Sequence, residues 1–411
     1  MRAIAAGKAA VGMAAAVEAV VGGRLEAGAI TAARTAVPSS RWRAFAATHP
    51  RPGPESEAAG RAALDLADRC RADHALLLVC LSGGASAMLA VPANGLTITD
   101  KSDTAACLLR AGLDIGSTNL VRRHLSAIKG GQLAARAGRS VTLAISDVCT
   151  PVEDDPRVIG SGPTSGDDST FAEALAVIRE HALADGIPAR ALRHLEVGAR
   201  AERAQPIVGA AGAGDHVAGP VPVNDPRLRA AAYWLTASRH DAMRAAAAAA
   251  ARLGYHVHTQ AAPVVGEARL AIAPLVEASR ALRRPSCFIA SGETTVVVRG
   301  SGAGGRNQEL AVAALEPLAQ IGAPTAFASM ATDGVDGPTD AAGAFVDHTL
   351  WGHLGAEAHS TVTRTLAQND TYTLLAQLDA LVRTGPTGTN VGDLQVILID
   401  ERAGHGPVTG G

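Results

Sequence analysis

The chain has 411 residues, of which 47% are hydrophobic and 18% are charged, with a formal net charge of −2. This length exceeds what one hydrophobic core usually serves, so we expect two domains of roughly 150–250 residues. The near-neutral charge and the dispersed basic residues argue against nucleic acid or a membrane surface as a partner. No stretch of about 20 apolar residues is without charge, and the five cysteines form no CxxC pair, so we expect a cytoplasmic protein without a membrane span.

Short apolar runs alternate with Gly-containing turns and helical stretches along the chain. The apolar runs predict strands at 3–6, 76–81, 141–145, 233–237, 255–259 and 296–298. The clearest helical patterns cover 239–253 and 306–319. Strands that alternate with helices predict the α/β fold class with mainly parallel sheets. Because such sheets bind ligands at the carboxyl ends of their strands, the residues that follow each strand are the candidate site residues.

The alternation is interrupted near the middle of the chain. Residues 204–226 contain four prolines, and the pattern restarts at about residue 228. We therefore predict a domain of residues 1–225 and a domain of residues 226–411.

Lys8 follows Gly7 at the end of the first apolar run and precedes an Ala-rich helical stretch. A cation at a helix N-terminus opposes the helix dipole, which costs roughly a few tenths of a kcal/mol. An anion held there by backbone N–H groups and the ammonium would explain the position, whereas a solvated surface lysine is the alternative. Only three of the 37 basic residues are lysines, namely Lys8, Lys101 and Lys129, which weakly favours a specific need for each ammonium.

A Gly-rich turn follows the second apolar run. Its residues Ser82, Gly83, Gly84 and Ser86 lie between a predicted strand and a helical stretch. Backbone N–H groups of such a turn can hold a phosphate or a carboxylate, although a purely structural turn is equally consistent with the pattern.

Arg306 repeats the arrangement of Lys8 in the C-terminal half. Gly304 and Gly305 end a flexible Gly-rich loop, and Arg306, Asn307 and Glu309 open the next helix. The guanidinium group suits a carboxylate or a phosphate. Pairing with Glu309 or another nearby acid is the alternative.

Carboxylates gather at two further strand ends. Asp147 lies just past a strand, and Thr332, Asp333, Gly334 and Asp336 belong to a loop that continues to an aspartate at 340. Closely spaced carboxylates suit Mg²⁺ or a general base, whereas Asx turns and helix caps are the alternative.

A polar stripe lies at 119–131. Arg122, Ser126 and Lys129 have the spacing of one helix face, with Asn119 one turn earlier. Such a stripe is typical of a solvated face, and Lys129 with the glycines after it also resembles a helix C-cap.

Two motifs are absent from the sequence. No GxxxxGK[ST] segment is present, which excludes a P-loop kinase, and no GxGxxG follows a strand, which argues against nicotinamide chemistry. The residues alone therefore predict a two-domain α/β enzyme that handles an anionic, phosphorylated ligand in loops between its domains.

Several segments, in their order along the chain, resemble the glycerate 2-kinase family that ends in a MOFRL domain. They are AAGKAA (5–10), HPRPGPES (49–56), LSGGASAML (81–89), NLVRRHLSAIKGG (119–131), SDV (146–148), IGSGPT (159–164), SGETTVVV (291–298), GAGGRNQEL (302–310), ATDGVDGPTDAAGAFVD (331–347), NDTYTLL (369–375) and TGPTGTNVGDL (384–394). The resemblance covers residues from about 3 to 400.

This resemblance implies transfer of a phosphoryl group from ATP, with Mg²⁺, to the 2-hydroxyl of D-glycerate. It implies an N-terminal Rossmann-like three-layer domain, a C-terminal α/β domain with the MOFRL region at about 285–400, and an active site in the cleft between them. By motif position, Lys8 and Arg306 are the implied catalytic residues, and Asp147 is added as a candidate base. The implied binding residues are Ser82, Gly83, Gly84, Ser86, Asn119, Lys129, Gly304, Gly305, Asn307, Glu309, Thr332, Asp333 and Gly334, with Asp333 and Asp336 as metal ligands.

The sequence also departs from the family pattern. Few residues precede Lys8, so we expect a short first strand without its usual packing, and Ser291 replaces a glycine. Two other functions therefore stay open, an NAD(P)H-dependent hydroxypyruvate reductase and an inactive homologue that binds a nucleotide or a sugar acid. The sequence also leaves a homodimer open.

Overall fold

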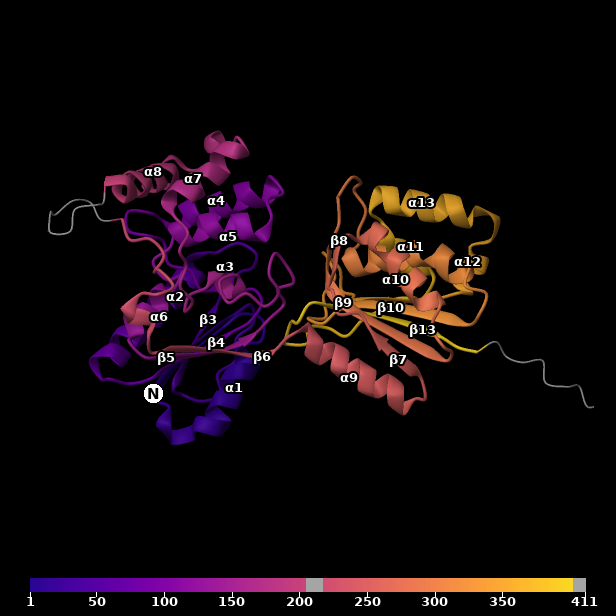
Figure 1. The fold of residues 1–411 in the computed structure, drawn as a ribbon, viewed down its shortest axis with the longest axis horizontal. Helices are drawn as coiled ribbons and strands as arrows, with labels where there is room; N and C mark the ends of the chain where they lie inside the picture. The colour runs from indigo at the N-terminus through magenta and orange to yellow at the C-terminus, as the bar shows by residue number, and fades with distance from the viewer. Residues whose placement is uncertain (205–216, 402–411) are drawn as a thin grey trace, which may run out of the picture. The chain divides into compact units, whose positions relative to one another are not determined.

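The structure is a computed structural model that describes residues 1–204 and 217–401. The chain divides into two compact units, Met1–Thr236 and Ala237–Gly411, each with its own sheet (Figure 1). The boundary predicted from the sequence lies eleven residues earlier, ahead of the strand at Ala231–Ala237. Among the described residues, no helix has the length and the apolar character needed to cross a membrane.

The first unit is built on a six-stranded sheet. Its strands, in spatial order, are β3 (Trp42–Ala46), β2 (Ala27–Ala32), β1 (Arg2–Ala6), β4 (Leu77–Leu81), β5 (Ser140–Ile145) and β6 (Ala231–Ala237). Strands β3 to β5 pair in parallel. Strands β2 and β3 lie on one side of β1, whereas β4 and β5 lie on the other. The direction of the strand order therefore reverses between β1 and β4, and the carboxyl ends of these two strands form the topological switch point of a Rossmann-like sheet.

Helices cover both faces of this sheet. They are α1 (Ala10–Val21), α2 (Pro54–Ala72), the short α3 (Ala85–Met88) and α6 (Gln132–Ala137). In β1, Ala3 and Ala5 pack with α1, whereas Ile4 and Ala6 pack with α2 on the other face (Figure 1). All five residues of β1 are buried and paired on both sides. The expectation that the first strand lacks packing is therefore wrong, because alternate small side chains let helices approach both of its faces.

A separate group of helices has its own apolar core within the first unit. It consists of α4 (Ile98–Arg110), α5 (Ile115–His124), α7 (Phe171–Glu180) and α8 (Ala189–Ala204). Helix α5 ends at His124, so Ser126 and Lys129 lie in the loop beyond it. The predicted helical stripe is therefore wrong past Arg122, because an Asp114 cap starts the helix and the chain leaves it after ten residues.

The second unit contains a sheet of different pairing. Its strands are β7 (His256–Thr259), β8 (Val264–Glu267), β9 (Ser286–Thr295), β10 (Thr325–Ala331), β11 (Gly343–Asp347), β12 (Leu381–Val382) and β13 (Asp393–Ile399). The order is β12-β11-β10-β13-β9-β7, with β8 also paired to β9. Only β7 and β8 pair in parallel, both with β9. Mainly parallel pairing was thus a wrong expectation for this unit, because β13 runs against both neighbours.

Helices also flank this second sheet. They are α9 (Arg239–Arg252), α10 (Ala268–Arg280), α11 (Arg306–Ala319), α12 (Leu350–His353), α13 (Ala358–Gln368) and α14 (Thr371–Gln377). In β9, Cys287 and Ile289 pack with α9, and Phe288 and Ala290 pack with α10 and α11 (Figure 1). The strand predicted at 296–298 is wrong, because pairing of β9 with β8 ends at Thr295 and the next residues leave the sheet.

Candidate active site

The switch point of the first sheet brings two predicted segments together. The backbone N–H of Lys8 donates to the carbonyl of Gly83 at 2.9 Å, and that of Ala9 donates to Ser82 Oγ at 3.0 Å. Ser82 Oγ in turn donates to the carbonyl of Ala6 at 3.3 Å and is fully buried. Ser82 therefore joins the ends of β1 and β4 and fixes the backbone that carries the half-buried Lys8 side chain.

Gly7 is required for this close approach. Its φ is 114°, and a Cβ at this position would overlap Ser82 Oγ and the Ser82 carbonyl. A side chain is excluded both by the backbone conformation and by space. The sequence GK at the end of β1 thus positions a lysine at the N-terminus of α1, as the sequence predicts.

Asn119 and Ser86 are linked by a serine that sequence reasoning missed. Ser161 Oγ donates to Asn119 Oδ1 at 2.8 Å and lies 2.5 Å from Ser86 Oγ. Ser161 is fully buried and has a φ of 61°, the left-handed region that favours glycine. Strain of this kind is found at ligand sites and turns that the surrounding structure must hold in place. Its position in the segment IGSGPT, between two glycines, was the available signal.

Lys129 contacts the Ser161 turn, and Asp147 follows β5. Lys129 is 1% exposed, and its Nζ donates to the carbonyls of Leu89 and Gly160 at 2.9 and 2.8 Å. Lys129 therefore holds the loops together around the Ser161 turn. Asp147 follows β5 as predicted and is half-buried at the carboxyl edge of the parallel sheet.

Arg306 opens α11 in the second unit, where it pairs with two acids. Its Nε and Nη2 donate to the two oxygens of Asp393 at 2.6 and 2.9 Å, and its Nη1 lies 3.0 Å from Glu293. The Arg306 side chain is 29% exposed, whereas Asp393 is fully buried. Burial lowers the pKa of Arg306, but Asp393 and Glu293 outweigh that effect and raise it overall. The guanidinium is thus always charged and held in one orientation.

The glycines before Arg306 are packed tightly. A Cβ on Gly305 would overlap the carboxylate of Asp336, and one on Gly304 would overlap Thr371 Oγ1. The expectation of a flexible Gly-rich loop is therefore wrong, because the loop needs glycine for close packing.

Asp336 caps α11. Its carboxylate accepts from the backbone N–H groups of Asn307 and Gln308 at 3.1 and 2.9 Å, and also from both side-chain amides. Burial, with a smaller contribution from Asp393, raises the pKa of Asp336 against the effect of these donors. Its oxygens are already used by the helix, which argues against its expected role as a metal ligand.

Asn307 and Glu309 point into the protein. Asn307 accepts from Ser329 Oγ at 2.5 Å, and Glu309 accepts from Arg269 at 2.9 and 3.1 Å and from Asn369 at 3.2 Å. Both are 1% exposed. Their polar atoms hold α11 in place, which argues against the direct ligand contact expected from the sequence.

Thr332, Asp333 and Gly334 follow β10, near the start of β13. Thr332 Oγ1 donates to the carbonyl of Gly392 at 2.6 Å, Asp333 Oδ1 accepts from Val335 N–H at 3.0 Å, and Gly334 has a φ of 85°. Asp333 is half-buried, whereas the nearby Asp340 pairs with Arg383 at the surface. The aspartates of this loop therefore make different contacts. Residues 1–204 and 217–401 contain no group of three Asp, Glu, His or Cys side chains that could hold a metal ion.

Sequence reasoning also missed Asp393, the partner of Arg306. It lies 87 residues away in the sequence, but it is the first residue of the apolar strand β13 and falls within the resembling segment 384–394. An acid at the first position of a strand lies at one end of that strand, as does an acid that directly follows a strand.

Comparisons with known proteins cover both units. Residues 1–196 match a family model described as a domain of unknown function (DUF4147), and residues 286–393 match the MOFRL family. A glycerate 2-kinase from Pyrococcus horikoshii is 32% identical over 98% of this chain and 88% of its own. A protein from Agrobacterium vitis with the provisional name hydroxypyruvate reductase is 36% identical over 96% of this chain and 98% of its own.

A solved structure shares the fold of the whole chain. The crystal structure of glycerate kinase from Thermotoga maritima superposes with a TM-score of 0.79 at 31% identity and covers 97% of this chain and 91% of that one. The two-domain α/β prediction is therefore confirmed. Together with the two family models, this agreement shows that the chain belongs to the glycerate kinase family with a C-terminal MOFRL domain.

Proposed function

We propose that this protein transfers the γ-phosphoryl group of ATP to the 2-hydroxyl of D-glycerate and produces 2-phosphoglycerate. The observation that carries the proposal is the switch-point corner, where Gly7 and Ser82 fix a lysine at the N-terminus of α1. Helix N-termini with an adjacent cation bind phosphate groups through backbone N–H donors and charge. Membership of the glycerate kinase family supports glycerate as the acceptor.

Phosphoryl transfer requires mainly positioning and stabilisation of charge. In this proposal Lys8 stabilises the oxygens of the transferring phosphoryl group. Arg306, oriented by Asp393, supplies a second fixed positive charge for the anionic substrates. Asp147 accepts the proton of the 2-hydroxyl. Lys8 and Arg306 act through their charge, and Asp147 acts as a general base.

Mg²⁺ is part of the proposal, and the donor set suits it. Proteins usually hold Mg²⁺ through one or two carboxylates and leave the remaining positions to water and phosphate oxygens. Asp333 is half-buried just after β10, whereas the carboxylate of Asp336 is bound to the first turn of α11, so we assign Asp333 as the metal ligand in place of Asp336. When bound, the ion neutralises charge on the phosphate groups.

An assay with ATP, Mg²⁺ and D-glycerate tests the proposal. We expect release of ADP that depends on D-glycerate, and a phosphorus NMR signal of 2-phosphoglycerate. A signal of 3-phosphoglycerate would correct the site of transfer. Oxidation of NADH or NADPH by hydroxypyruvate would support the reductase instead, and no turnover in either assay would support an inactive binding protein.

A further inference from the structure

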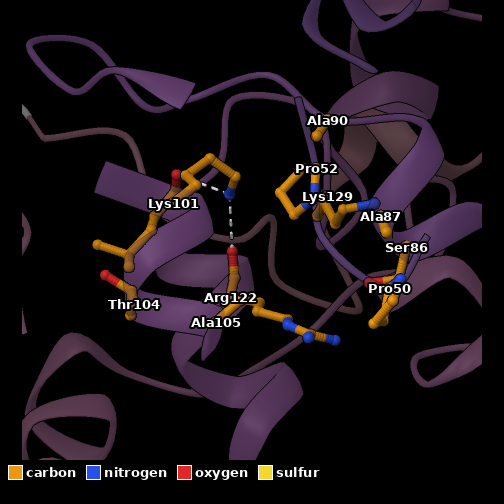
Figure 2. A pocket seen from close by; sticks show the side chains of 11 residues that line it. Pro50, Pro52, Ser86, Ala87, Ala90, Lys101, Thr104, Ala105, Arg122 and Lys129 are labelled. Atoms are coloured by element: carbon orange, nitrogen blue, oxygen red, sulfur yellow. Dashed lines mark hydrogen bonds between the residues drawn. The ribbon is translucent and has the colours of Figure 1, made fainter. Parts of the chain in front are cut away.

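A small basic pocket lies within the first unit, beside the Gly-rich turn at 82–86 (Figure 2). It is formed by Pro50, Pro52, Ser86, Ala87, Ala90, Lys101, Thr104, Ala105, Arg122, Leu125 and Lys129. Three of these side chains are basic, and they reach the pocket from α4, from α5 and from the loop after α5. We call this group, with Ser86, the basic pocket.

Two ammonium groups of this pocket are buried. Lys101 is 7% exposed, and its Nζ donates to the carbonyls of Leu125 and Arg122 at 2.9 and 3.3 Å. Lys129 is bound in the same way by two carbonyls and is 1% exposed. Each ammonium has three N–H donors. The two carbonyl contacts of each lysine therefore account for two of its three donors.

Arg122 has still fewer contacts. It is half-buried, and among the described residues its guanidinium neither donates a hydrogen bond nor pairs with a carboxylate. A guanidinium carries five donors and stays charged. A partly buried arginine without a partner in the protein is ready to bind a planar oxyanion.

No negative side chain balances these three cations. In the described part of the chain, neither lysine pairs with an Asp or a Glu. Burial, and to a smaller degree the charge of Arg122, lowers the pKa of Lys101 to about 7. Burial, Lys101 and Arg122 likewise lower the pKa of Lys129. No acid lining the pocket offsets this effect of burial on the two pKa values, and an anion bound there would favour the charged form of both lysines.

We propose that the basic pocket binds the carboxylate of the hydroxy-acid substrate, with Arg122 as its main contact and Lys101 and Lys129 as supporting charges. This inference rests on the proposed function. The cavity itself measures about 20 Å³, room for little more than one water-sized group, so it can admit the carboxylate end of a small acid but not a nucleotide. Ser86 belongs to the same turn as Gly83, whose carbonyl accepts a hydrogen bond from the backbone N–H of Lys8. The pocket therefore adjoins the proposed phosphoryl-binding site at Lys8.

The test compares Arg122→Met with Arg110→Met. Arg122→Met removes the charge without breaking a hydrogen bond in the protein. Arg110→Met removes the same charge from an exposed position at the end of α4. We expect Arg122→Met to raise KM for D-glycerate about 10- to 100-fold, with KM for ATP unchanged, because bonds to charged groups have this strength. Arg122→Lys should restore part of the loss, and Arg110→Met should behave as wild type.

A binding measurement separates this inference from the function on which it rests. D-glycerate alone should raise Tm of the wild-type protein but not of Arg122→Met, and glycerol, which lacks the carboxylate, should raise neither. Wild-type turnover with an unchanged KM for D-glycerate in Arg122→Met would overturn the inference and leave the kinase intact. A rise in KM for ATP alone would assign the pocket to nucleotide phosphate and overturn the carboxylate. Absence of D-glycerate binding to the wild-type protein would overturn both.

Discussion

Arg306 and Arg122 both belong to helices at candidate ligand sites, but their surroundings are opposite. Arg306 is fixed by the buried Asp393 and by Glu293. Arg122 lies beside two buried lysines, and none of the three cations pairs with an acid in the described residues. The second unit therefore carries its own counter-charge and keeps its arginine oriented, whereas the first unit depends on a ligand to supply negative charge. One site is preorganised, and the other is completed by binding.

Removal of the counter-charge in the second unit should have the largest effect. Asp393→Ala leaves Arg306 partly buried without its bidentate partner, and breaking a buried pair costs about 3–5 kcal/mol. Chemical denaturation should show this loss, together with a large fall in kcat. Asp340→Ala is the control, because its pair with Arg383 is exposed and should contribute little to stability. Equal losses in the two variants would remove the distinction between the two regions.

Removal of the cations themselves should act on the reaction rather than on folding. We expect Lys8→Ala and Arg306→Ala each to lower kcat by about 100-fold or more, since both groups stabilise charge that develops during transfer. Steady-state kinetics measures this effect, and circular dichroism checks the fold. Arg364→Ala, at an exposed position on α13, should leave kcat unchanged. Near-normal kcat in Lys8→Ala or Arg306→Ala would refute the assignment of that residue.

Asp333 and Asp336 have different expected roles in the second unit. Asp336→Ala removes the cap of α11 and should lower the free energy of unfolding by about 2 kcal/mol. Asp333→Ala should leave stability near that of wild type and raise the Mg²⁺ concentration needed for half-maximal activity. If Asp336→Ala rather than Asp333→Ala changes the Mg²⁺ requirement, the metal assignment is reversed.

The last prediction concerns the pH dependence of stability in the first unit. The pKa of Lys101 falls from 10.5 to about 7 on folding, so between these values the unfolded chain binds more protons. The stability of the ligand-free protein should therefore rise by up to about 1.4 kcal/mol per pH unit from Lys101 as pH rises from 7 towards 10.5, and this contribution should stay constant below pH 7, where Lys101 is protonated in both states. Denaturation of the wild-type protein and Lys101→Met from pH 6 to 9 measures the difference. If the free energies of unfolding of the two proteins change with pH in parallel, the pKa of Lys101 is not lowered on folding.

Local features were predictable where neighbouring residues decide them. The run 76–81 with its Gly-rich turn gave β4 and the switch-point loop, and the pattern 306–319 gave α11. The parallel pairing expected of the second sheet was wrong, because strand direction depends on β13, which inserts between β9 and β10 from far along the chain. The helical stripe was wrong for a related reason, since Lys129 is anchored by loops that lie 40 and 31 residues away.

The candidate site shows the same division. Lys8 and Arg306 were singled out because a cation in the first turn of a helix is unfavourable on local grounds. Asp393, Ser161 and the hydrogen bond from Lys101 to the Arg122 carbonyl were not singled out, because these contacts join distant segments. The scarcity of lysine pointed to all three lysines, but it gave no indication that two of them are buried in one pocket.

The central position of β13 has a consequence for biosynthesis. Strands β9 and β10 are made about a hundred and about sixty residues before the strand that lies between them. Until the ribosome has released Asp393–Ile399, the facing edges of β9 and β10 lack their partner, and exposed strand edges are templates for aggregation. The first unit can pair β1 to β5 much earlier in synthesis. We therefore expect the second unit to fold after the first and to be the part of the nascent chain that most needs chaperones.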